Sequence, residues 1–163
     1  MEEAKPIKRS KELAPFSREH HDGLLFVWKI KQGIANGTPL ETLAGYVRWY
    51  WDNHLKPHFT TEENVLVKYL PADNELVHQM INEHKQIQEL IISVRRQPDA
   101  NSLRVLAGLI NDHIRFEERK LFTYAEQELT PEQLQDIYNA FPHKTYCNID
   151  RTGGWKNEFW IRK

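Results

Sequence analysis

Residues 58–66, HFTTEENVL, and residues 113–121, HIRFEERKL, follow one pattern, H-x-x-x-E-E-x-x-L. In an α-helix, two side chains four residues apart lie one above the other on the same face. The histidine and the first glutamate of each stretch can therefore reach one metal ion. These two pairs are His58 with Glu62 and His113 with Glu117.

The second glutamate of each stretch, Glu63 or Glu118, comes one residue later. One residue turns an α-helix by about 100°, so these carboxylates are weaker candidates for direct contact with a metal. A rotated helix would bring Glu118 inward in place of its neighbour.

A shorter phrase, Glu-His, occurs at residues 19–20 and again at residues 83–84. His84 and His20 each lie on an apolar stripe with helical spacing, which is the face that turns toward a core. His21 is the alternative ligand in the first of these phrases. Its upstream neighbours are polar, so the sequence favours His20.

The positions of the histidines relative to the predicted turns support one common level. His58 is 13 residues before Pro71, and His84 is 13 residues after it. In an antiparallel helical hairpin, residues equally far from the turn lie at one height. His113 fits the same level, whereas His20 is offset by about one helical turn, roughly 5–6 Å of rise.

Apolar residues recur at helical spacing in four long stretches that short polar turns separate. Short connections between long helices predict an antiparallel up-down four-helix bundle. The expected fold is therefore all-α, in one domain over residues 1–163. The bundle occupies about 13–128, a short fifth helix about 131–141, and an aromatic C-terminal tail 142–163. The four long helices are expected at about 15–35, 40–70, 72–96 and 102–128.

Proline and threonine mark several helix boundaries. Thr38 and Thr130 are each followed by proline and then, three residues on, by Glu41 or Gln133, which predicts a capping box at both places. Pro57 falls inside the second helix, where it removes a backbone donor and should bend the helix.

The chemistry of these side chains suits a site for two metal ions. Imidazole nitrogen and carboxylate oxygen suit iron, manganese and zinc, and helix bundles are a common scaffold for two-iron sites. Each glutamate has two oxygens and can bridge two ions. Two buried cations need compensating negative charge, which two glutamates and a bridging oxide or hydroxide would supply in part. Zinc and manganese are the expected substitutes.

Composition excludes several other classes of protein. Lys plus Arg total 22 and Asp plus Glu total 23, so the chain has no basic footprint for nucleic acid or an anionic membrane. No apolar run approaches the ~20 residues of a membrane span. The charged N-terminus lacks the apolar stretch of a secretory signal, and Cys147 is the only cysteine, so we expect a cytoplasmic protein.

The remaining histidines and aromatics have structural interpretations. His54, one turn before His58, is expected to be a hydrogen-bonding or surface residue, and His78 and His143 are expected at the surface. The aromatic cluster around Tyr46 and Tyr50, with Trp49 and Trp51, is expected to be core. The tail aromatics Trp155, Phe159 and Trp160 are expected to pack on the bundle, and the protein to be a monomer or weak homodimer.

In combination, these motifs resemble the hemerythrin-like, or HHE cation-binding, family. The resemblance covers roughly residues 13–128 and rests on the two Glu-His phrases and the two H-x-x-x-E-E stretches. It implies a non-haem di-iron centre in a four-helix bundle, with Glu62 and Glu117 as bridging carboxylates. The implied ligands are His20, His58, Glu62, His84, His113 and Glu117.

One departure from the family concerns the third helix. Members that carry oxygen have two histidines four residues apart there, whereas this chain has Met80 four residues before His84 and Gln88 four residues after it. The third helix is therefore expected to supply one imidazole, and simple reversible oxygen carriage is disfavoured.

The resemblance implies a protein that binds or senses a small diatomic ligand, oxygen first and nitric oxide second. The alternatives are an enzyme that turns over peroxide or nitric oxide in stress defence, and a module for iron storage or delivery. Binding is favoured over catalysis.

Overall fold

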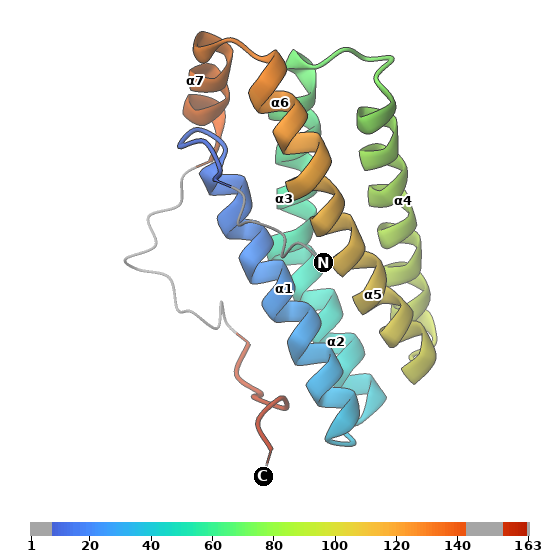
Figure 1. The fold of residues 1–163 in the computed structure, drawn as a ribbon. Helices are drawn as coiled ribbons and strands as arrows, with labels where there is room; N and C mark the ends of the chain where they lie inside the picture. Colours follow the sequence, from blue (N-terminus) through green and yellow to red (C-terminus); the bar gives the residue numbers. More distant parts are fainter. Residues whose placement is uncertain (1–7, 143–154, 163) are drawn as a thin grey trace, which may run out of the picture.

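A computed structural model describes residues 8–142 and 155–162, and over these residues the chain is helical with no strand (Figure 1). The all-α prediction is confirmed. Continuous helical runs extend from residue 14 to 35, 40 to 69, 75 to 96 and 100 to 128. Their α-helices are α1 (Ala14–Ala35), α2 (Leu40–Tyr50), α3 (Lys56–Thr61), α4 (Glu75–Arg96), α5 (Ala100–Phe116) and α6 (Phe122–Glu128), followed by α7 (Pro131–Ala140).

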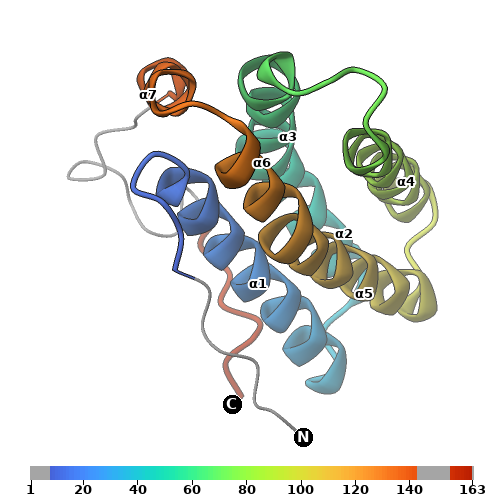
Figure 2. The ribbon, with the colours of Figure 1, turned by 45° about the horizontal axis from the view of Figure 1, so that its top comes forward.

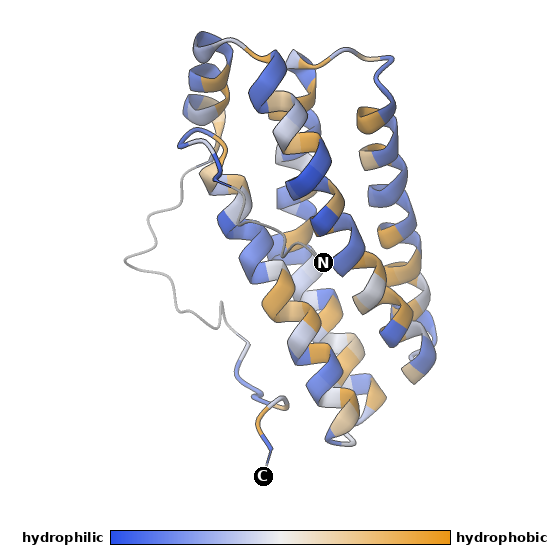
Figure 3. Ribbon diagram, in the orientation of Figure 1, coloured by the Kyte–Doolittle hydropathy of each residue, from blue (hydrophilic) through white to orange (hydrophobic). Residues whose placement is uncertain are grey.

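The helical runs lie side by side as a bundle (Figures 1 and 2). α1 packs along α5, α4 packs against both α5 and α2, and α1 also contacts α2. α7 lies at one end of the bundle, where it contacts the turn that follows α3. Figure 3 shows hydrophobic and hydrophilic residues interspersed along the helices, as expected of helices that bury one face.

Helix caps explain where several helices begin. Asn74 accepts hydrogen bonds from the backbone at the start of α4, and Asp99 does the same at the start of α5. The capping box at Thr130 is confirmed. The capping box predicted at Thr38 is wrong. α2 is capped by Pro39 without a side-chain hydrogen bond, and the Thr38 N–H instead donates to the Gly33 carbonyl.

Wide π-helical turns interrupt two of the runs. One, Trp51–Leu55, immediately precedes α3 and accommodates Pro57, which lies in the first turn of α3. The other two are Glu62–Leu66 and Glu117–Leu121, and each begins at the first glutamate of a repeated stretch. The repeat therefore specifies the same local backbone twice, an α-helical turn followed by a π-helical turn. Such turns are frequent at functional sites.

The buried apolar residues form two separate clusters. One contains Phe26, Ile87 and Ile110 with their neighbours, and the other contains Phe16, Met80 and Leu121 with theirs. Along α1, His20 lies between Phe16 and Phe26, and along α4, His84 lies between Met80 and Ile87. The histidines therefore occupy a layer with apolar packing on both sides.

The described end of the tail packs on the bundle, as predicted. Phe159 is buried, and its ring lies 5.0 Å from that of Tyr46. The ring of Trp155 lies 5.1 Å from that of Tyr46, and Lys29 Nζ lies 4.0 Å from the ring centre of Trp160. In the described part of the chain, no helix has the length and apolar character needed to cross a membrane.

Candidate metal centre

The two repeated stretches present their side chains to the interior of the bundle. His58 Nε2 lies 3.1 Å from Glu62 Oε1, and His113 Nε2 contacts Glu117 Oε1 in the same way. Both histidines are buried, and both glutamates are fully buried with no exposed area. Helical spacing of four therefore produces two matched pairs at one level.

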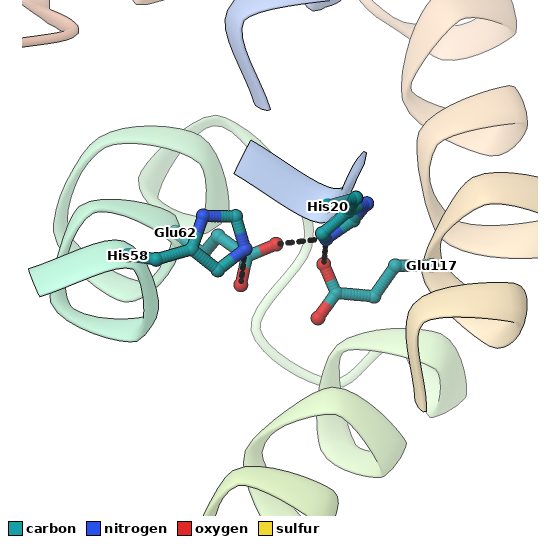
Figure 4. A group of neighbouring side chains, drawn as sticks. All are labelled: His20, His58, Glu62 and Glu117. Carbon is teal, nitrogen blue, oxygen red and sulfur yellow. Dashed lines mark ion pairs between the residues drawn. The ribbon is translucent and has the colours of Figure 1, made fainter. Parts of the chain in front are cut away.

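His20 of α1 joins these pairs. Its Nε2 atom lies 3.7 Å from Glu62 Oε2 and 3.3 Å from Glu117 Oε2 (Figure 4). The side chain of His20 is buried, whereas that of His21 is exposed. The structure thus brings His20 to the cluster and directs His21 to solvent.

His84 of α4 approaches from the opposite side of the glutamates. Its Nε2 atom lies 3.3 Å from Glu62 Oε1 and 3.4 Å from Glu117 Oε1. Each glutamate therefore contacts three histidines, and both glutamates lie between the two pairs of imidazoles.

The ligand atoms form two groups of four. In each group, the atoms lie within 4.8 Å of one another. Both groups contain Glu62 and Glu117. The first adds His20 and His58, and the second adds His84 and His113. Two ions held in these groups would share both carboxylates.

Buried polar atoms without hydrogen bonds show that this donor set fits cations. Such atoms are costly unless something compensates them. Within the described residues, most of them converge at this one place. They are the Nε2 atoms of His20, His58 and His113, both side-chain oxygens of Glu62, and Glu117 Oε2. A divalent cation accepts electron pairs from these atoms, so the residues present fit metal ions.

Electrostatics within the cluster favour charged side chains. Burial alone lowers the pKa of His58, but Glu62 and Glu19 outweigh it and raise that pKa to about 9. Burial likewise opposes the charge on His84, yet hydrogen bonds to the surrounding glutamates raise its pKa to about 11. Burial raises the pKa of Glu117, but His113 and His20 hold it well below its usual range. The cluster is a dense set of buried opposite charges.

Each of the four histidines also has a carboxylate beside its outer ring nitrogen, Nδ1. We call Glu19, Glu63, Glu83 and Glu118 the outer carboxylates. Sequence reasoning did not assign them this role, although each adjoins a ligand candidate in the chain. The Nδ1–Oε distances are 3.0 Å for His58 with Glu19, 2.8 Å for His113 with Glu83, 2.7 Å for His20 with Glu118, and 3.5 Å for His84 with Glu63.

The outer carboxylates orient the imidazoles. A carboxylate at Nδ1 accepts a hydrogen bond from the ring N–H, which keeps that proton on Nδ1 and leaves Nε2 facing inward to bind a metal. Glu118 is held in turn by Arg9, whose Nη2 lies 3.1 Å from Glu118 Oε2 and whose Nη1 lies 2.6 Å from Glu126 Oε1. The segment before α1 thus supports His20, a candidate ligand, through Glu118.

A small cavity adjoins the cluster between α1, the second helical run and α5. Its volume is about 20 Å³, which is enough for one water or a ligand of only a few atoms. Its wall includes three of the four clustered histidines. The lining residues are Glu19, His20, Asp22, Gly23, Tyr50, His54, Leu55, His58, Phe59, Ile110, His113 and Ile114.

The other histidines lie outside the cluster. His54 lies on the cavity wall, with its ring centre 5.1 Å from that of Trp49 in an edge-on contact and 5.3 Å from that of Tyr50. His78 is at the surface, where Nε2 lies 2.9 Å from the Ala72 carbonyl. His143 and Cys147 lie outside the described residues.

Comparison with known proteins agrees with this geometry. Residues 13–125 match the family model described as the hemerythrin HHE cation binding domain. Searches of curated proteins and of solved structures gave no significant match. The matched span covers most of the chain and contains all six clustered residues. On this evidence the chain belongs to the hemerythrin HHE cation-binding domain family.

Proposed function

We propose that the protein holds two iron ions in the His/Glu cluster and binds or senses a small diatomic ligand there, oxygen first and nitric oxide second. The proposed ligands are the four histidines and two glutamates of the cluster, His20, His58, His84, His113, Glu62 and Glu117. The observation that supports two ions is the sharing of Glu62 and Glu117 between both groups of ligand atoms.

Charge supports a further bridging anion. Two divalent cations carry four positive charges, and Glu62 and Glu117 supply two negative charges. A bridging oxide or hydroxide would offset one or two more, and the outer carboxylates lie near enough to stabilise the remainder. Iron suits this mixed imidazole and carboxylate set, and zinc or manganese are chemically reasonable substitutes.

The cavity supports a small-molecule ligand. It adjoins His20, His58 and His113, and its volume of about 20 Å³ suits a ligand of only a few atoms. Iron, when bound, would supply a redox-active ion at which such a ligand can bind. The protein's part is to orient the imidazoles, neutralise charge and exclude bulk water.

The proposal includes the scaffold, an antiparallel up-down four-helix bundle. Its support is the course of the chain in Figure 1, where short connections join α1 to α2, the second helical run to α4, and α4 to α5. Such bundles place ligands from facing helices around one centre.

Metal content tests the proposal first. Protein loaded anaerobically with ferrous iron should contain about two irons per chain, the number that two groups of ligand atoms imply. Glu62→Ala should lose iron, whereas Glu63→Ala, one residue further round the helix, should retain it. His20→Ala and His21→Ala form a second matched pair. A single tightly bound ion in the wild type would contradict the two-iron proposal.

Gas binding tests the second part. The optical spectrum of the reduced, iron-loaded protein should change on addition of oxygen or nitric oxide in a saturable manner. Steady-state consumption of peroxide or nitric oxide with a reductant would instead favour an enzyme. Ready release of iron without either response would favour storage or delivery.

A further inference from the structure

The hydroxyl group of Tyr50 lies in the cavity wall and has no hydrogen-bond partner among the described residues. Tyr50 ends α2, and only 6% of the residue is exposed. Within residues 8–142 and 155–162, its hydroxyl makes no hydrogen bond. The hydroxyl is absent from the set of fully buried polar atoms without a partner, so a water-sized molecule can reach it, and Tyr50 lines the cavity beside the metal cluster.

Gly23 locates this hydroxyl relative to the metal cluster. A Cβ atom built on Gly23 would lie 3.8 Å from Tyr50 Oη and 2.9 Å from Ile114 Cδ1. Gly23 follows His20 by three residues on α1, about one helical turn or roughly 4.5 Å of rise. The hydroxyl therefore faces α1 about one turn from His20, across the same cavity.

The ring of Tyr50 is held in position by its neighbours. It stacks on Phe26, with ring centres 4.2 Å apart and an angle of 13° between the planes. On another side the ring of His54 lies 5.3 Å away. Because these contacts restrict the ring, the hydroxyl is directed by packing and not by a hydrogen bond of its own.

Tyr50 is suited to donate a proton in a hydrogen bond without losing it. Burial raises the pKa of its hydroxyl well above 10, and the negative charges of Asp22 and Glu19 raise it further. The hydroxyl thus remains protonated at neutral pH. It can donate to a guest in the cavity, whereas its nearest charged neighbours there disfavour a phenolate.

We propose that Tyr50 Oη donates a hydrogen bond to the small ligand held in the cavity beside His20 and His58. The preferred ligands are then small molecules or anions whose outer atom accepts a hydrogen bond. This inference rests on the proposed function. It adds a residue that orients the ligand and discriminates among ligands by their capacity to accept a hydrogen bond.

Azide is the probe for the test, because its terminal nitrogen accepts hydrogen bonds and its stretching band is visible in the infrared. Iron content is measured first in the wild type, Tyr50→Phe and Tyr46→Phe. Tyr46 is the matched control, since it lies one turn earlier on α2, is also buried, and does not line the cavity. All three proteins should contain the same amount of iron.

Tyr50→Phe should weaken azide binding about tenfold, which corresponds to about 1.4 kcal/mol at 25 °C. Transfer to D2O should shift the azide band in the wild type and in Tyr46→Phe, and this shift should be lost in Tyr50→Phe. A purely structural role for the hydroxyl would not remove the isotope shift selectively.

The outcomes separate the two proposals. If Tyr50→Phe retains its iron, its azide affinity and the isotope shift, the role of Tyr50 is refuted and the di-iron proposal stands. If the wild type holds no iron or does not bind azide, the proposed function fails, and the role of Tyr50 fails with it.

Discussion

Glu118 and Glu63 occupy equivalent positions in the two repeated stretches, yet their surroundings differ. Glu118 Oε1 lies 2.7 Å from His20 Nδ1, and Arg9 fixes its other oxygen. Glu63 is 3.5 Å from His84 Nδ1 and its side chain is 41% exposed. Although the two stretches repeat in sequence, Glu118 therefore holds His20 more firmly than Glu63 holds His84.

Glu118→Ala should lower metal affinity by roughly 10- to 100-fold, the usual effect of removing a partner that orients a metal-binding histidine. Glu63→Ala should change it far less, because the contact is long and solvated. Competition with a chelator of known affinity measures both. An equal loss of metal affinity in both variants would contradict the stronger role given to Glu118.

Gln88 is exposed, whereas Met80, one turn before His84, is fully buried. Replacement of Gln88 by histidine would therefore place an imidazole in solvent and leave the cluster unchanged. We expect Gln88→His to retain the wild-type iron content and azide affinity, measured by elemental analysis and optical titration. A changed optical spectrum would show that this side chain reaches the metals. A second imidazole from α4 would need the position that Met80 occupies.

At the scale of the helices, the features that follow from local periodicity could be predicted from the sequence. The spacing of four residues paired His58 with Glu62, and the apolar stripe favoured His20 over His21. Pairings between helices were not predictable in this way. Glu118 and His20 are 98 residues apart, and only the packing of α1 against the fourth helical run brings them together.

The π-helical turns were also missed, because no residue preference marks them as proline or glycine marks a helix end. The turn Trp51–Leu55 fits an extra residue into the run between Leu40 and His58. It absorbs part of the offset between His20 and His58 expected from counting residues to the turn. In the structure, the rings of these histidines lie 4.9 Å apart.

Two glycines test how closely the helices pack. A Cβ atom on Gly33 of α1 would lie 2.5 Å from Leu43 Cδ2 and 2.7 Å from Phe159 Cδ2, whereas one on Gly108 of α5 would meet no atom within 4 Å. Gly33→Ala should lower the free energy of unfolding by about 1–2 kcal/mol through overpacking. Gly108→Ala should raise it by about 0.5–1 kcal/mol, since alanine is the better helix former.

Urea denaturation of both glycine variants measures the two effects. Tryptophan fluorescence provides a second readout for Gly33→Ala, because Phe159 and the neighbouring Trp160 would have to shift. Stabilisation by both substitutions would mean that α1, α2 and the tail pack more loosely than the structure shows.

For the whole molecule, the charged cluster predicts how stability depends on pH when metal is removed. The pKa is about 9 for His58 and about 11 for His84 in the folded chain, against about 6.5 in an unfolded one. Above pH 6.5 the folded state therefore binds more protons than the unfolded state. The stability that these histidines contribute is complete below pH 6.5 and is lost as pH rises through 9 to 11.

The urea midpoint of chelator-treated protein should accordingly fall between pH 6.5 and 10. Iron-loaded protein should not show this fall, because metal binds the neutral imidazole and replaces the proton. Parallel titrations with and without metal measure the difference. A metal-free midpoint that rises over this range would contradict the ion pairs described for the cluster.

The sharing of Glu117 between both groups of ligand atoms has a consequence for synthesis of the chain. A nascent polypeptide that has emerged from the ribosome only as far as α4 already carries His20, His58, Glu62 and His84, but it can complete neither group. Both groups become complete at the same point, when the last α5 turn and Glu117 have emerged. If the cluster holds two ions as proposed, neither ion would have its full set of ligands until Glu117 has emerged, and metal loading would be a late step in synthesis.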